Sequence, residues 1–83
     1  MLAPLAPNPT RGAATVRWEL PRDTDARVAV YGAWGREVVV VAEGAQGAAA
    51  HEATPWGLAP GAYVVRLTTA SGGAESARLT VVR

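Results

Sequence analysis

Apolar and polar residues alternate in short valine-rich segments along most of the chain. In the clearest segment, residues 14–20, Ala14, Val16, Trp18 and Leu20 share one face, and polar residues occupy the other. A period of two is typical of a β-strand with one buried face. No segment predicts a helix. Six strands are predicted in this way, at residues 14–20, 27–31, 37–42, 48–54, 62–69 and 75–83.

Two predicted strands depart from simple alternation. Segment 37–42 is an unbroken apolar run after its first residue, which predicts a strand buried on much of both faces. Segment 48–54 begins with alanines, which favour helix, but the flanking glycines and Pro55 leave too little room, so an edge strand is expected. At 58–61, Pro60 before Gly61 predicts a type II turn. The remaining turns are predicted at residues 21–25, 32–35, 43–47 and 71–74.

Six or seven short strands with a turn every eight to twelve residues or so are typical of an immunoglobulin-like sandwich. We therefore expect an all-β fold: an immunoglobulin-like β-sandwich of about seven short antiparallel strands. Residues 1–12 contain Pro4, Pro7 and Pro9 and are predicted to form a proline-rich lead-in, with the domain at residues 13–83. Met1 is expected to be an addition made for expression.

Composition limits both the core and the partners. With no Phe and no Cys among 83 residues, the core must be built from Val, Leu, Ala and three Trp, without disulfides. Eight arginines and no lysine stand against seven acids, and no basic block occurs, which argues against nucleic-acid binding. The arginine preference fits the codon bias of a GC-rich genome better than selection for ion pairs in a protein from a thermophile.

The residues that carry catalysis are scarce. His51 is the single histidine, whereas a zinc site needs three or four ligands, and neither Ser71 nor Ser76 lies in a nucleophile elbow. Asp23 and Asp25 are better explained as turn residues than as calcium ligands. We therefore expect no metal, no cofactor and no enzymatic activity.

The three tryptophans leave one binding function open. Trp18 lies in the apolar register of its strand and is expected in the core, whereas Trp34 and Trp56 lie in turns, where each either caps the sandwich or is exposed. Exposed aromatic rings in one plane stack on sugars. A carbohydrate-binding accessory module of a secreted glycoside hydrolase is therefore one alternative function, although burying area is the more common role of an aromatic ring.

Three groups of residues, taken in order, resemble the C-terminal sorting domain (type A) of the bacterial type IX secretion system. Pro-Asn-Pro precedes the first strand, Gly-Arg-x-Val restarts a strand after the turn in 28–38, and Leu-x-x-Gly-x-Tyr opens the strand in 58–67. The resemblance extends from about Leu5 to Arg83. A less specific similarity is to immunoglobulin-like domains of flagellar hook-capping proteins. The motif residues are Pro7, Asn8, Pro9, Gly35, Arg36, Gly61, Tyr63, Arg78 and Arg83.

The resemblance implies roles for several of these residues. Gly35 and Gly61 are expected to adopt backbone angles denied to other residues, and Arg36 to bond nearby carbonyls or a carboxylate. Tyr63 is expected to anchor its ring in the core, with its hydroxyl satisfied near a loop. The chain departs from the family at Gly32, where Asp or Asn is usual, and in ending on arginines where lysine is common.

The function implied by the resemblance is non-catalytic. Such a domain directs secretion across the outer membrane, and the upstream cargo of the same chain, often a catalytic domain, is then attached to the cell surface. The implied partners are the outer-membrane secretion machinery and a sortase-like peptidase, reached through the periplasm. Recognition through the exposed last strand by edge pairing is one expectation. The remaining alternative is an inert structural spacer.

Overall fold

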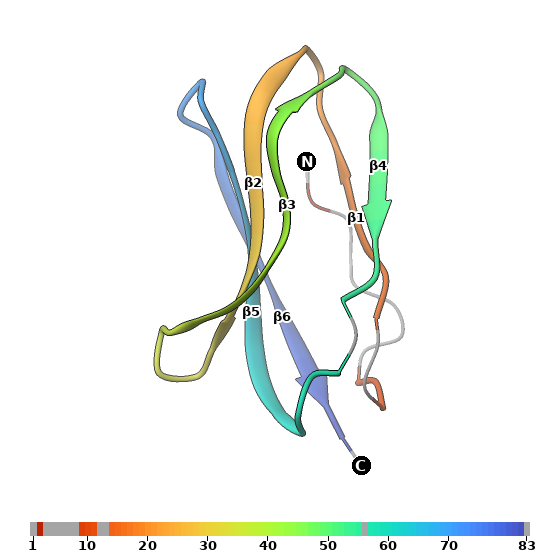
Figure 1. Ribbon diagram of the computed structural model, residues 1–83, viewed down its shortest axis with the longest axis vertical. Helices are drawn as coiled ribbons and strands as arrows, with labels where there is room; N and C mark the ends of the chain where they lie inside the picture. The colour runs from red at the N-terminus through yellow and green to blue at the C-terminus, as the bar shows by residue number, and fades with distance from the viewer. Residues whose placement is uncertain (1, 3–8, 12–13, 56, 83) are drawn as a thin grey trace.

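The computed structural model describes residues 2, 9–11, 14–55 and 57–82. Within them the chain forms two antiparallel sheets and no helix, and the two sheets face each other as layers of a sandwich (Figure 1). The smaller sheet has the order β1–β4 and the larger one β3–β2–β5–β6. The predicted all-β, immunoglobulin-like sandwich is confirmed. The strands are β1 (Val16–Glu19), β2 (Thr24–Gly32), β3 (Glu37–Gln46), β4 (Ala50–Ala53), β5 (Gly61–Thr69) and β6 (Ala74–Val81).

Two residues of the lead-in pair with the sandwich. Leu2 forms an antiparallel bridge with Trp18 of β1, and Thr10 forms a parallel bridge with Val81 of β6. The Thr10 amide donates to the Thr80 carbonyl (2.9 Å), and its carbonyl accepts from the Val82 amide (2.7 Å). Thr10 is itself buried. The segment before β1 therefore contacts both sheets, and it covers the end of β6, which is otherwise an edge.

The core lies between the two sheets and is made of the residues whose alternation predicted it. The inward positions of β1 are buried, as are those of β2, β5 and β6 that face them. A two-stranded sheet is marginal by itself in water, so β1 and β4 depend on this packing for their order. The buried hydrophobic residues in the contact between the layers are Ala14, Val16, Trp18, Leu20, Ala26, Val28, Val30, Leu58, Val65, Leu67, Leu79 and Val81.

Trp18 joins the layers by a polar contact as well as by packing. Its indole Nε1 donates to Oε1 of Gln46 in β3 (2.8 Å), and Gln46 Nε2 donates to the Ala26 carbonyl in β2 (3.2 Å). On the other side, the ring of His51, which is opposite Trp18 in β4, stacks on the indole with 5.7 Å between centroids. A buried indole N–H needs such a partner. Trp18 is therefore a core residue, as predicted.

The prediction that segment 37–42 is buried on both faces is wrong. Val38 is 49% exposed, and Val39 and Val40 are also exposed, because β3 is one of the two edge strands of the larger sheet. The pairing of β2 with β3 shifts register twice within the valine run, between Val28 and Ala29 and again between Val30 and Tyr31. Such bulges break the alternation and twist an edge strand away from unwanted pairing partners.

Turn predictions were less accurate than strand predictions. The turn expected at 43–47 is wrong, because β3 continues through Glu43 to Gln46 in register with β2, which begins at Thr24 rather than Arg27. The type II turn at 58–61 is also wrong: Gly61 has a φ of 155°, far from the value of about +80° that this turn requires. The edge strand at 48–54 is confirmed as β4, and the hairpin turn at 71–74 joins β5 to β6.

Tyr63 occupies the corner where the chain enters β5. Its ring packs against the core, and its hydroxyl donates to the carbonyl of Ala59, four residues upstream. This is the arrangement of a tyrosine corner, which fixes the crossing between the two sheets of an immunoglobulin-like sandwich. The expectation that the ring is anchored against the core with its hydroxyl satisfied is confirmed, with the ring partly buried.

We predict that Tyr63→Phe destabilises the domain by about 0.5–1.5 kcal/mol, because the corner loses one hydrogen bond while the ring still packs. For a domain of this size, that corresponds to a fall in the thermal midpoint of several degrees, roughly 4–8 °C per kcal/mol. Thermal unfolding followed by circular dichroism measures it. Tyr31→Phe is the comparison variant, since it also removes one tyrosine hydroxyl, bonded to Arg27 Nη1 (3.0 Å) on the outer face of the sheet, and leaves the corner intact. Equal stability of Tyr63→Phe and the wild type would contradict the role of the corner.

Candidate functional site

The best candidate site is a depression of about 420 Å³ on the outer face of the larger sheet. Cross-strand register builds it: Tyr31 in β2 is opposite Val64 in β5, which is opposite Arg78 in β6. In the next row, Arg66 of β5 is opposite Ser76 of β6. Side chains paired across strands share one face of a sheet, so these rows form one surface. The turn between β2 and β3 borders the depression through Ala33 and Gly35.

This part of the sheet is cationic. The outward positions of β5 and β6 carry Arg66 and Arg78, and none of them carries an acid; the others are Ala62, Val64, Thr68, Ala74, Ser76 and Thr80. Diagonal neighbours on adjacent antiparallel strands are roughly 7–8 Å apart, which is the relation between Arg66 and Arg78. Two guanidinium groups within reach of one another favour an anion between them.

Two acids of the outer face, Glu37 and Glu43, are instead bound by Arg27 at the β3 edge of the sheet. Arg27 in β2 donates from Nε to Glu43 of β3 (2.8 Å) and from Nη2 to Glu37, and its Nη1 donates to the Tyr31 hydroxyl (3.0 Å). These bonds, with Glu37 first, raise the pKa of Arg27 above its usual value. Ala29 lies between Arg27 and Tyr31 on the same face of β2 and is only 1% exposed. The network therefore ties the bulged edge strand to its neighbour and covers Ala29.

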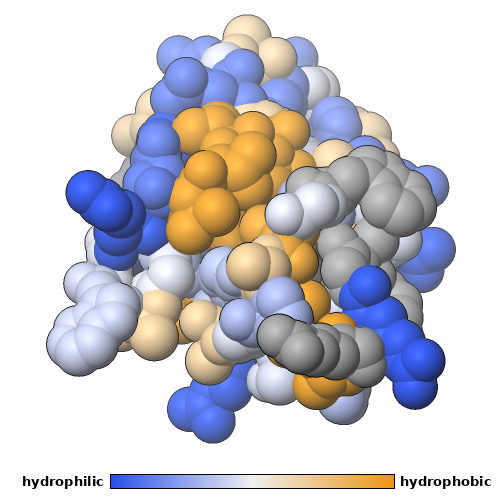
Figure 2. All heavy atoms as spheres, turned by 60° about the horizontal axis from the view of Figure 1, so that its bottom comes forward, coloured by the Kyte–Doolittle hydropathy of each residue, from blue (hydrophilic) through white to orange (hydrophobic). Residues whose placement is uncertain are grey.

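Trp34 lies in the β2–β3 turn that borders the depression and is 98% exposed. Its chain neighbours Ala33 and Gly35 both line the depression, and Gly35 has a φ of 81°, an angle that favours glycine. Together with Val38, Val39 and Val40, Trp34 gives this region exposed hydrophobic surface. Figure 2, which brings the lower end of the sandwich forward, shows hydrophobic surface bordered by hydrophilic side chains. Exposed apolar surface of this kind, rather than a single exposed residue, makes this region a candidate binding surface.

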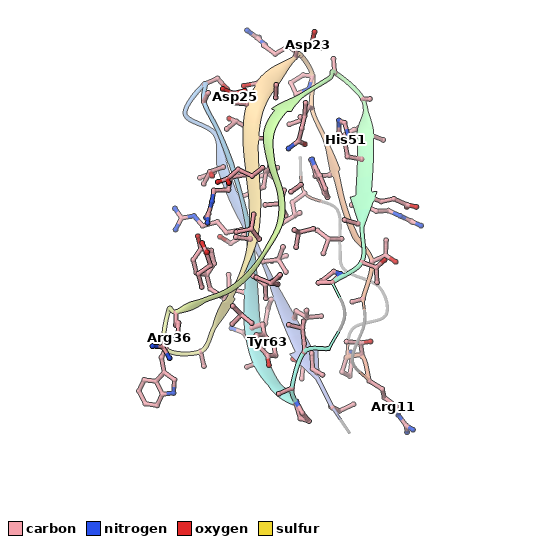
Figure 3. All side chains as sticks on the ribbon, viewed as in Figure 1. Arg11, Asp23, Asp25, Arg36, His51 and Tyr63 are labelled. Atoms are coloured by element: carbon pink, nitrogen blue, oxygen red, sulfur yellow. The ribbon has the colours of Figure 1, made fainter. Side chains whose placement is uncertain are left out.

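The structure gathers several of the motif residues around this depression. Gly35, Tyr63 and Arg78 line it, and Gly61 precedes the lining residue Ala62. Figure 3 shows Arg36 and Tyr63 at the same end of the sandwich, with Asp23 and Asp25 at the opposite end. Pro9 is exposed. Pro7, Asn8 and Arg83 lie outside the described residues, as does Trp56.

Arg36 does not make the bonds expected of it. Its side chain is exposed and forms no hydrogen bond or ion pair with the part of the chain that the structure describes. The neighbouring carboxylate, Glu37, is bound by Arg27 instead. The main-chain carbonyl of Arg36 closes the turn by accepting from the Gly32 amide (2.8 Å). Arg36 is therefore held at the turn by its backbone, and its charge faces solvent near the depression.

Sequence reasoning missed Arg66, Tyr31 and Ser76. The signal was present in the strand register: Arg66 alternates with the inward Val65 and Leu67, and Arg78 alternates with Leu79, so both arginines had to face outward. What the sequence did not give was the order of the strands. Only that order makes β5 the neighbour of both β2 and β6.

The other residues considered for chemistry have structural roles. His51 Nε2 hydrogen-bonds the Gly47 carbonyl (2.8 Å), and Asp23 Oδ1 accepts from the Ala48 amide (2.8 Å), which supports turn chemistry there. In the described ranges, no three His, Asp or Glu side chains are grouped to hold a metal ion. The same residues contain no helix able to span a lipid bilayer.

No protein-family model, curated protein or solved structure matches this chain.

We predict that Arg27→Gln lowers the thermal midpoint most at low ionic strength, because the bonds from β2 to the edge strand are charge-assisted and exposed to salt. The difference from the wild type should shrink in about 1 M NaCl, where the Debye length is roughly 3 Å. A raised arginine pKa means that this stability is fully present below the ordinary pKa and is lost only as pH rises through the folded-state value. The effect should therefore be constant across neutral pH.

Arg17→Gln is the matched control. It removes a single exposed ion pair, from Arg17 to Glu52 (2.9 Å), in the smaller sheet. Such a pair contributes little to stability. The thermal midpoint of both variants is measured at two salt concentrations. A larger, salt-dependent fall for Arg27→Gln than for Arg17→Gln distinguishes the network from a single surface ion pair. Equal losses in the two variants, or a loss for Arg27→Gln that salt does not change, would contradict the role assigned to Arg27.

Proposed function

We propose that this chain is a non-catalytic sorting domain that directs an upstream cargo of the same polypeptide across the outer membrane to the cell surface. The basis is the ordered set of motifs that resembles the type IX C-terminal sorting domain. Two of these motifs have definite structural roles in the fold, since Gly35 adopts a positive φ in the β2–β3 turn and Tyr63 forms the corner before β5. A domain that folds by itself presents a recognition surface while its cargo folds separately.

The observation that carries the proposal is the position of β6. This last strand of the resemblance is an edge of the larger sheet, so one side of its main chain can pair with a partner strand. The Thr80 carbonyl and the Val82 amide point outward, because both bond Thr10. With a period of two, the main-chain groups of Ser76 point the same way, beyond the part of β6 that Thr10 covers. β-Strand addition at this edge is our proposed mode of recognition by the secretion machinery.

An export assay tests the function. The domain is fused behind a reporter that carries a signal peptide, and surface-exposed reporter is measured in a type IX-competent bacterium and in a strain lacking the outer-membrane translocon. We expect surface reporter only in the competent strain and only with the domain attached. Retention of the reporter in the periplasm of the competent strain, with the domain folded and intact, would overturn the proposal.

The mode of recognition is tested by Ser76→Pro in the same assay. Proline removes the outward amide without removing a bond to β5, and edge strands tolerate proline at such positions. We expect surface reporter to fall to the level seen without the domain. Ser76→Ala is the matched control, because it removes the hydroxyl and keeps the amide. Normal export of a folded Ser76→Pro variant would refute edge pairing at β6 while leaving the sorting function itself standing.

A further inference from the structure

We propose that the tip of the β2–β3 hairpin, residues 33–36, binds the surface of an anionic lipid bilayer, with Trp34 inserting among the lipids and Arg36 bonding a headgroup phosphate. This inference does not depend on export. It rests on one juxtaposition at the end of a projecting hairpin. An indole that is almost fully exposed stands two residues from a guanidinium that bonds to nothing in the described ranges.

The turn holds both side chains away from the body of the sandwich. The Gly32 amide donates to the Arg36 carbonyl (2.8 Å), and the Gly35 amide donates to the Gly32 carbonyl (2.9 Å), so the turn is closed by its own backbone. In Figure 1 it projects sideways from the lower part of the larger sheet, and Figure 3 shows Arg36 there. The lead-in residues that pair with the sandwich contact β1 and β6 instead. All residues from 33 to 40 are therefore exposed.

The charge that the tip presents is positive. Residues 33–36 contain no acid. Glu37 follows directly, but its carboxylate is bound by Arg27, which also binds Glu43 (2.8 Å). A planar guanidinium matches the oxygens of a phosphate, and a cation close to a membrane is attracted by anionic lipids. Arg36 is therefore free to bond a headgroup without first breaking a bond to a described residue.

Apolar side chains flank the tip on both faces of the hairpin. Val40 is opposite Ala29 on the outer face, whereas Val39 is opposite Val30, whose side chain points into the core. Val39 and Val40 are each 37% exposed, although they lie on opposite faces. Val38, nearer to the turn, is also exposed. The hairpin therefore exposes apolar surface around its end and not on one side alone.

A bilayer fits this arrangement better than a protein partner does. Tryptophan is enriched at the boundary between headgroups and acyl chains, where its ring is apolar and its N–H stays hydrated. An insertion of about 5–10 Å, typical of interfacial segments, places the indole at this boundary and Arg36 at the phosphates. Lipids surround an inserted turn and cover valines on both faces, whereas a docked protein covers one face. A stable protein interface also buries roughly 800 Å² per partner, more than a short turn provides.

The test is co-sedimentation of the whole chain with vesicles, combined with fluorescence quenching. Vesicles of phosphatidylcholine alone are compared with vesicles of phosphatidylcholine and phosphatidylglycerol in equal amounts, at low ionic strength. We expect stronger binding to the mixture, and added salt should reduce the difference between the two compositions. Lipids brominated on their acyl chains should quench the part of the fluorescence that is lost in Trp34→Ala, because bromine quenches only a ring that reaches the chains.

Variants separate the two contacts. Trp34→Ala should weaken binding to the mixture about tenfold and abolish the quenching, and the core stays intact because the indole is 98% exposed. Arg36→Gln should weaken binding to the mixture roughly fivefold, remove most of the preference over phosphatidylcholine, and leave the quenching of bound protein unchanged. Arg22→Gln is the matched control for charge. Arg22 is exposed and precedes Asp23, which Figure 3 places at the opposite end of the sandwich.

The flanking valines are tested by Val38→Ser. We expect it to weaken binding to both kinds of vesicle, by less than Trp34→Ala does. Val82→Ser is the matched control, because Val82 is similarly exposed (41%) but follows β6, at the other edge of the larger sheet. Circular dichroism of each variant shows that it is folded before its binding is compared.

Three results would overturn the proposal. The first is no binding of the wild type to either kind of vesicle. The second is binding that Trp34→Ala and Arg36→Gln leave unchanged, or that Arg22→Gln weakens as much as Arg36→Gln does, which would indicate a general attraction of the whole domain. The third is a dimer of the wild type that forms without lipid and that Trp34→Ala abolishes, which would assign the surface to a second copy of the chain.

Discussion

The packing of Trp18 between the two sheets is the contact on which the rest of the structure depends. A two-stranded sheet gains little from its own hydrogen bonds, so β1 and β4 stay in place because their inward side chains are removed from water by the larger sheet. Trp18 is the largest of these side chains, and Gln46 satisfies its indole N–H from across the sandwich. One residue thus supplies apolar area and a directional bond between layers, in a chain without disulfides.

The distribution of apolar and charged residues between the two faces of the larger sheet follows from this core. Inward positions of β2, β5 and β6 hold mostly Val, Leu, Ala and Tyr, so the charges on these strands lie on the outer face or at the strand ends. There the charges separate by strand: the acids of β3 meet Arg27, while Arg66 and Arg78 on β5 and β6 stay together. The positive charge beside the depression therefore follows from the order of the strands as much as from composition.

Alternation in the sequence was enough to predict the all-β class, the inward residues of four strands and the core position of Trp18. It failed where burial depends on strand order, as in the valine run of β3, whose residues are apolar on both faces yet lie at an edge. It failed at Glu43 to Gln46 because a glycine there predicts a turn, whereas the register with β2 holds the segment extended. Of the candidate site, the sequence pointed to Gly35, Tyr63 and Arg78, but Arg66 and Tyr31 became neighbours only through pairing across strands.

The edges of the sandwich show how such a domain can offer one strand for recognition without aggregating. β3 is protected by its two bulges, and Trp18 of β1 and the end of β6 each pair with a residue of the lead-in. The bridge described at β6 lies at its end, the Leu2 amide donates to the Glu75 side chain (3.0 Å), and the outward arginine and serine side chains keep the middle of the strand polar. An edge that is left unpaired but polar is disfavoured for self-association and remains open to a partner that brings its own strand. The depression lies on the outer face of β6, and the main-chain groups that can pair lie along its edge. The two surfaces can therefore be used at the same time.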